Sequence, residues 1–210
     1  MFSELSGQNL EKIESPDATD IKSMPEQISE RKEISTPLPE STEIVTRQQD
    51  IAKQDELSKA FRNGEIEPKD TQEKGNFGEI MTDIHMRVSG YERISKDIVT
   101  GLQDAGHQGI DGIYYNPEGH PPYVIVDAKF GSAQLSETAD GKQMSAEWID
   151  KRLDAAVGKE KADEIRMEKL MNPENVGSFV ARVDEAGNVT LDRLDQNANV
   201  IEKDVKLNAA

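Results

Sequence analysis

Residues 109–130 read GIDGIYYNPEGHPPYVIVDAKF, two apolar runs separated by a stretch rich in turn-forming residues. Because successive side chains of a strand point to opposite faces, Asp127 and Lys129 in the second run project from the same face. A turn at PEGHPP would fold the two runs into a hairpin, with Asp111 at the start of its first strand. We therefore predict paired strands over 107–116 and 122–130 that bring two carboxylates and one ammonium group together.

A helix is predicted before this hairpin, beginning near Gly75 and ended by Gly90. Its apolar residues recur every three or four positions and so form one stripe, which comprises Phe77, Ile80, Met81, Ile84 and Val88. Glu79 lies beside this stripe. We therefore expect Glu79 at the edge of the surface on which the helix packs.

Two helices and a small sheet are predicted after the hairpin. Ser145 is expected to cap a helix over 145–158, and a second helix over 159–171 ends before Pro173. Residues 178–207 alternate between apolar and polar positions and are interrupted by EAGN and DQNAN. This pattern predicts a C-terminal antiparallel meander of three short strands.

The N-terminal part differs in composition from the rest. Residues 1–42 are rich in Glu, Ser, Pro and Thr and have too little apolar surface to offset the entropy of ordering, which predicts a linker or disordered arm. Residues 43–70 have apolar positions at helical spacing, and the helix is expected to begin near Ser41 or Thr42. Residues 71–210 then form the main domain.

The overall composition excludes several kinds of site. With 25 basic and 41 acidic residues, the net charge of −16 argues against a protein that holds nucleic acid through its overall field, so any such contact would be local or bridged by metal. The chain has no cysteine, which excludes disulfides, thiolate ligands and a cysteine nucleophile. No apolar run approaches membrane-spanning length, and the N-terminus lacks the pattern of a cleavable signal peptide. Export as a passenger of a larger polypeptide or secretion machine remains compatible with this.

The residue types in the hairpin favour metal chemistry. Two converging carboxylates repel each other unless a cation lies between them, and Mg²⁺ or Mn²⁺ take oxygen ligands. Asp111, Asp127 and the carbonyl of Ala128 would provide such ligands, Lys129 would orient or deprotonate a water, and Glu79 would complete the set. The alternative is structural: Asp111 caps a turn, and Asp127 and Lys129 form a solvated pair on an open face.

The order of these residues resembles the PD-(D/E)XK nuclease superfamily, whose core runs helix, three-stranded antiparallel meander, helix, strand. The resemblance implies an α+β protein (α/β core) with a restriction-endonuclease-like mixed sheet flanked by helices. Glu79 matches the helix acid, Asp111 the acid of the first strand, and Asp127-Ala128-Lys129 the (D/E)-x-K element. Ile110 stands where the superfamily has its proline.

Residues 70–175 are more closely similar to the C-terminal nuclease domains of bacterial polymorphic toxins of the contact-dependent inhibition and Rhs types. GIDGIY, VDAKFG and KQMSAEWI carry this resemblance. It implies an endonuclease dependent on a divalent metal (Mg²⁺ or Mn²⁺, with Zn²⁺ as a further candidate) that hydrolyses DNA or tRNA. It also implies delivery as an effector, action in the cytoplasm of a target bacterial cell, and a cognate immunity protein.

Several other polar residues surround the proposed site. Gln143 would reach the catalytic water or a phosphate, or make a hydrogen bond at the helix entry. Three cations near the site are proposed to contact phosphate: Lys142, Lys151 and Arg152. The alternative for each is a solvated position on the surface of a helix. His107 would contact the nucleic acid, and the alternative for it is a structural or exposed position. Trp148 is expected to be a core anchor rather than a base-stacking platform.

Two other functions remain open. The first is a non-catalytic interaction or adaptor module, tethered to a delivery machine by residues 1–42. The second is an RNase that cleaves tRNA without metal, in which His107 or His120 supplies acid-base chemistry. Cleavage that resists EDTA would select the RNase, and absence of metal binding would favour the adaptor.

Overall fold

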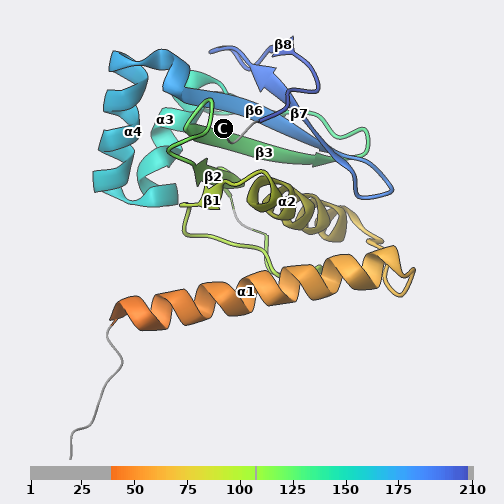
Figure 1. The fold of residues 1–210 in the computed structure, drawn as a ribbon. Coiled ribbons are helices and arrows are strands. Elements are labelled where there is room, and N and C mark those ends of the chain that lie inside the picture. Colours follow the sequence, from red (N-terminus) through yellow and green to blue (C-terminus); the bar gives the residue numbers. More distant parts are fainter. Residues whose placement is uncertain (1–38, 107, 208–210) are drawn as a thin grey trace, which may run out of the picture. The chain divides into compact units, whose positions relative to one another are not determined.

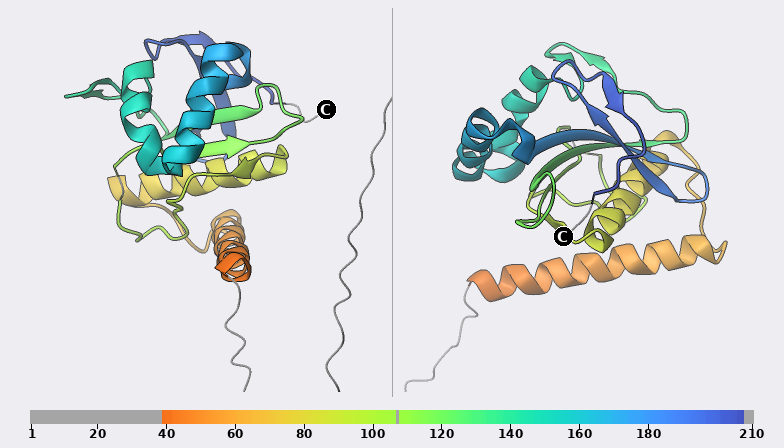
Figure 2. Two further views of the ribbon diagram at one scale, coloured as in Figure 1. Left: turned by 90° about the vertical axis from the view of Figure 1, so that its left-hand side faces the viewer. Right: turned by 45° about the horizontal axis from the view of Figure 1, so that its top comes forward.

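The computed structural model describes residues 39–106 and 108–207, and these belong to one compact unit. The linker predicted within 1–42 lies outside the described residues up to residue 38, as does His107. Figure 1 shows a sheet with α2 on one side and α3 and α4 on the other, and the views of Figure 2 agree. None of the helices described is long and apolar enough to cross a membrane.

The chain forms a mixed α+β architecture. Its helices are α1 (Pro39–Arg62), α2 (Thr71–Val88), α3 (Ala146–Val157), α4 (Lys159–Met171) and the short 3-10 helix η1 (Pro173–Asn175). Its six-stranded sheet has the order β1 (Glu92–Arg93), β2 (Gly112–Tyr115), β3 (Tyr123–Phe130), β6 (Val176–Val183), β7 (Val189–Leu194) and β8 (Val200–Glu202). Within this sheet β3 and β6 are parallel, and every other neighbouring pair is antiparallel.

Strand β3 lies at the centre of the sheet and is buried on both faces over most of its length. One apolar layer packs beneath α3 and α4 and includes Ile113, Ile125, Trp148, Leu153 and Val180. The layer on the α2 side includes Met86, Tyr114, Val124, Val126 and Phe179. By alternation, Asp127 and Lys129 share the face of Ile125, which is the face covered by α3 and α4.

Helix α2 begins earlier than predicted. It starts at Thr71 rather than near Gly75, because the side chain of Asp70 accepts a hydrogen bond of 2.9 Å from the backbone N–H of Glu73. Glu73 in turn accepts 2.6 Å from the N–H of Lys69. The spacing of Asp70 and Glu73 is that of a capping box, a signal present in the sequence.

The predicted apolar stripe of α2 is wrong at its C-terminal end. Val88 is 83% exposed, whereas Met86 is fully buried. The two residues are two positions apart and so point to opposite sides of the helix, and only Met86 packs on Val124 and Val126.

The remaining elements follow the prediction in part. Helix α4 has the predicted range, and Ser145 caps α3 by accepting from the backbone N–H of Trp148. The predicted meander is formed by β6, β7 and β8, although β6 is long and joins the main sheet beside β3. Strand β2 is shorter than predicted. Sequence analysis missed β1 and the two-stranded ladder of β4 (Glu137–Thr138) and β5 (Gly141–Lys142).

We expect Met86→Ala to lower the free energy of unfolding by about 2–5 kcal/mol, because it leaves a cavity in the layer between α2 and the sheet. Val88→Ala on the same helix should change it by less than about 0.5 kcal/mol, because Val88 is exposed. Urea unfolding followed by circular dichroism measures both. Equal losses for the two variants would contradict this packing of α2.

Candidate active site

The β2–β3 hairpin brings the two predicted aspartates together. Gly112 pairs with Val126, so Asp111, one residue before β2, comes opposite Asp127. The Asp111 Oδ2 atom accepts a hydrogen bond of 2.8 Å from the backbone N–H of Ala128. The side chain of Asp111 therefore bonds to the backbone of the residue that separates Asp127 from Lys129.

Asp127 is fully buried and has two side-chain partners. Gln143 donates from Nε2 to Oδ1 over 2.5 Å, and the ammonium group of Lys129 forms an ion pair with Oδ2. The Lys129 side chain is 13% exposed. The alternative of a solvated pair on an open face is therefore wrong, because the α3 side of the sheet is covered.

The burial of Asp127 changes its titration. Desolvation, and then the nearby charge of Asp111, raise its pKa from 3.8 to about 7, although the contacts with Lys129 and Gln143 act in the opposite direction. The Oδ2 atom is buried and has no partner with hydrogen-bond geometry. Its nearest charged partner is the ammonium group of Lys129.

The orientation of Gln143 is set by the loop that precedes it. Its backbone N–H donates 2.9 Å to the carbonyl of Ser136, and its side-chain Oε1 accepts 3.2 Å from the N–H of Ser136. With Oε1 so engaged, Nε2 is directed at Asp127. The role of Gln143 in the structure is thus to hold the carboxylate, and α3 begins only three residues later.

Helix α2, which carries Glu79, packs on the opposite face of the sheet from Asp127 and Lys129. Glu79 is half-buried there, and its charge raises the pKa of both Arg93 and Tyr114 as a minor contribution. Within residues 39–106 and 108–207 no three His, Cys, Asp or Glu side chains gather as ligands of one ion. The predicted ligand set of Glu79, Asp111 and Asp127 is therefore not assembled.

A buried polar network on the α2 side of the sheet, which sequence analysis missed, holds the backbone carbonyl of Asp111. Asp83 accepts 2.5 Å from Arg93 Nη1 and 2.5 Å from the Tyr114 hydroxyl. Arg93 Nη2 also donates 2.6 Å to the carbonyl oxygen of Asp111. Gln54 of α1 donates 2.7 Å to Asp83. The available signal was an aspartate inside the apolar stripe of α2, where an unpaired charge would be costly.

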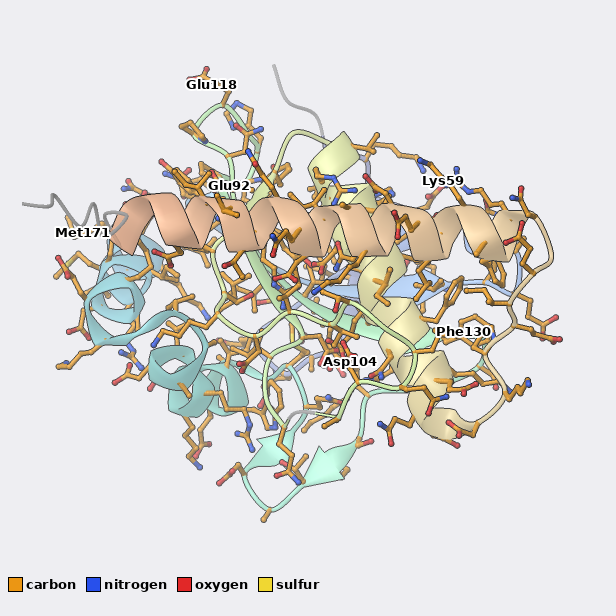
Figure 3. The ribbon with its side chains drawn as sticks, turned by 90° about the horizontal axis from the view of Figure 1, so that it is seen from below. Lys59, Glu92, Asp104, Glu118, Phe130 and Met171 are labelled. Atoms are coloured by element: carbon orange, nitrogen blue, oxygen red, sulfur yellow. The ribbon has the colours of Figure 1, made fainter. Side chains whose placement is uncertain are left out.

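The charges of this network stabilise one another. Burial alone would lower the pKa of Arg93, but the charges of Asp83 and Tyr114, the hydrogen bond to Asp83 and the smaller contribution of Glu79 together outweigh it, and the pKa is raised overall. Burial, followed by the charge of Asp83, raises the pKa of Tyr114 well above its ordinary value. Arg93 and Tyr114, with Gln54 and Asp83, also line a pocket of about 390 Å³ that is separate from Asp127. Figure 3 views the molecule from the side of α1 and labels Glu92, another residue that lines this pocket.

The three cations that were predicted to contact phosphate have different partners in the structure. Arg152 and Lys151 both pair with Asp140, at 3.0 and 3.3 Å, and the Arg152 guanidinium lies 4.2 Å from the centre of the Trp148 ring. Trp148 is 3% exposed and is a core residue, as predicted. Lys142 lies 3.5 Å from the side-chain oxygen of Asn199 and has a neutral partner there.

Of the two histidines considered for metal-free catalysis, only His120 lies among the described residues. It is exposed and belongs to the turn between β2 and β3. Asp127 lies four residues beyond Tyr123 along β3, so roughly 13 Å of strand separates the turn from the aspartates. His120 is therefore at the opposite end of the hairpin from the site.

Comparison with models of protein families, with curated proteins and with solved structures gives no match to this chain. The function must accordingly be argued from the geometry around Asp127.

We predict that burial of Asp127 makes the native protein less stable as pH rises from about 4 to 7. Its pKa is raised in the folded state, so across this window the unfolded chain has lost a proton that the folded chain keeps. The loss should reach roughly 3–4 kcal/mol. Asp127→Asn should remove this component, measured as the difference between the two urea-unfolding curves from pH 4 to 8 in EDTA.

Asp140→Asn is the matched control. The Asp140 side chain is 42% exposed, and its hydrogen bond with Arg152 lowers its pKa, so Asp140 stays ionised across this window. Parallel pH profiles for the native protein and Asp127→Asn would contradict the predicted effect of burial.

Proposed function

We propose that this protein is a metal-dependent nuclease that hydrolyses phosphodiester bonds, with Asp111, Asp127 and Lys129 at its centre. The observation that carries the proposal is the meeting of two carboxylates and one ammonium group on one covered face of the sheet. If Asp127 and Lys129 were only a surface ion pair, the burial of both groups would have no explanation. A site that binds a cation and a phosphate explains why these charges are buried.

The order of elements supports the restriction-endonuclease-like fold. Helix α2 is followed by the antiparallel strands β1, β2 and β3, then by α3 and α4, and then by β6 parallel to β3. This is the sequence of helix, meander, helix and strand that the resemblance implies. Asp111 directly precedes β2 and the Asp127-Ala128-Lys129 element lies on β3, which is the arrangement of acids and lysine that the resemblance implies.

The donor set suits a hard divalent cation such as Mg²⁺ or Mn²⁺. Asp111 and Asp127 would be its ligands, because both offer carboxylate oxygens and each raises the cost of the other's charge. Oδ2 of Asp127 is buried and already faces the ammonium group of Lys129, so this oxygen lies where positive charge is favoured and a divalent cation would replace that contact. When bound, the ion would polarise the scissile phosphate and lower the pKa of a nearby water.

The remaining residues have roles that follow from their contacts. Lys129 would orient the attacking water and offset phosphate charge once its contact with Asp127 is relaxed by the cation. Gln143 would keep Oδ1 of Asp127 in place through the 2.5 Å hydrogen bond. Glu79, whose helix packs on the other face of the sheet, would complete the set through a water rather than as a direct ligand.

The biological setting is proposed from the resemblance to polymorphic toxins. In that setting the protein is delivered as an effector, cleaves DNA or tRNA in the cytoplasm of a target bacterium, and is restrained in the producing cell by a cognate immunity protein. The net charge of −16 means that binding to the substrate depends on metal and on local cations rather than on long-range attraction.

We expect the protein to cut plasmid DNA or total tRNA with Mg²⁺ or Mn²⁺ and to be inactive in EDTA, with Zn²⁺ as a further arm. Asp127→Ala and Lys129→Ala should each reduce the cleavage rate by at least about 100-fold, since each removes a group from the reacting centre. Asp154→Ala, an exposed residue of α3, is the control and should cut like the native chain. Undiminished cutting by either site variant would refute the proposal.

Metal binding can be tested without cleavage. We expect isothermal titration with Mn²⁺ to detect one site in the native protein and to lose it in Asp111→Asn, because one of two carboxylate ligands is removed. Asp154→Asn should bind like the native chain. Absence of binding to the native protein would favour the adaptor module, and EDTA-resistant cleavage would favour the metal-independent RNase.

A further inference from the structure

Arg182 lies beside Lys129 on the face that carries the site. Strands β3 and β6 are parallel, and Lys129 is the register partner of Arg182, as Asp127 is of Val180. Val180 packs in the apolar layer under α3 and α4, so Arg182, two residues later, projects from the same side. Neighbouring strands lie about 4.8 Å apart, which makes Arg182 the adjacent cation on the sheet.

The charge of Arg182 is less neutralised than that of other arginines with acidic partners. Its guanidinium approaches a carboxylate only at 3.7 Å, from Nε to Asp192. By contrast, Arg152 pairs at 3.0 Å, and Arg166 lies within 2.6–3.1 Å of three aspartates. Because Coulomb attraction falls with distance, Arg182 keeps more of its positive field.

The hydrogen bonds of Arg182 hold it at the site without cancelling its charge. Nη1 donates 2.8 Å to the carbonyl of Ala133, and Nη2 donates 3.4 Å to the side-chain oxygen of Gln134. Both acceptors are neutral, and both belong to the loop that leads from β3 to Ser136, the partner of Gln143. The Arg182 side chain is 25% exposed, so its outer edge is open to a ligand.

We propose that Arg182 is a phosphate-binding residue of the site and contacts the polynucleotide backbone next to the bond that is cut. The inference rests on the proposed nuclease function and adds a residue to it. In a chain of net charge −16, a polyanion needs local cations. Lys129 is engaged with Asp127, which leaves Arg182 as the neighbouring cation that can meet a second phosphate. A planar guanidinium is well suited to phosphate oxygens.

The test measures binding and cleavage separately. Affinity is measured by fluorescence anisotropy with labelled duplex DNA and labelled tRNA, over a series of salt concentrations with Mn²⁺ present, in a Lys129→Ala background that keeps both proposed metal ligands and cuts slowly. Arg182→Ala, Arg182→Lys and the control Arg166→Ala are compared there. Arg166 belongs to the surface network of α3 and α4 and has no contact with the site. Cleavage rates are measured for the same variants with Lys129 intact.

We expect Arg182→Ala to raise Kd by about tenfold or more and to reduce the slope of log K against log salt by roughly 0.7–0.9. Arg182→Lys should keep the slope, because it keeps the charge, and should recover much of the affinity. Arg166→Ala should match its parent. Thermal melts show whether each variant is folded. If Arg182→Ala does not fold, Arg182→Lys serves as the binding test in its place.

Each other outcome has a distinct meaning. If the native protein cuts nucleic acid but Arg182→Ala retains affinity and slope, the role of Arg182 is overturned while the nuclease stands. If cleavage falls in both variants with affinity and slope unchanged, Arg182 anchors the 131–136 loop and does not bind phosphate. If the native protein neither binds nor cuts DNA or tRNA, the proposed function fails and this inference fails with it.

Discussion

A buried carboxylate at the centre of the sheet is the constraint on which the rest of the site depends. Asp127 sits on β3 between two neighbouring strands and under two helices, where an uncompensated charge is unfavourable by several kcal/mol. Lys129 and Gln143 offset part of the cost of burying the Asp127 carboxylate. The pKa of Asp127 is still raised, because burial and the charge of Asp111 outweigh these two contacts. The loop before α3 carries Gln143 and holds it, through Ser136, in the position where it donates to the Asp127 carboxylate.

The second aspartate is held by backbone geometry. Asp111 bonds through its side chain to the N–H of Ala128 and through its carbonyl to Arg93. Arg93 is in turn paired with Asp83, and Asp83 accepts from Gln54 of α1. The two helices on the far side of the sheet are thereby connected to one residue of the site by hydrogen bonds among buried groups.

The parallel pairing of β3 and β6 adds residues of β6 to the site. It aligns Arg182 with Lys129, and the antiparallel neighbour β7 then brings Asp192 within 3.7 Å of Arg182. Acidic and basic groups consequently form a polar strip across otherwise apolar strands. Within this strip the opposite charges partly compensate one another, Lys129 with Asp127 and Arg182 with Asp192.

Local pattern in the sequence was enough to predict the helices α2, α3 and α4, the hairpin, the C-terminal meander and the shared face of Asp127 and Lys129. These features depend on periodicity, caps and turns, which act over a few residues. Short β1 and the β4–β5 ladder were missed because two-residue strands have no periodicity. Val88 was misplaced because periodicity does not show which side of a helix end finds a packing partner, and Met86 on the other side is the buried residue.

Only the tertiary structure decided which groups meet. It placed α2, and with it Glu79, on the face opposite Asp127, and it buried Asp83 with Arg93 and Tyr114. It also paired β6 with β3, which put Arg182 beside Lys129 although 53 residues separate them in the chain. Pairing between strands so distant in sequence depends on the burial of whole faces, and no short stretch of residues contains that information.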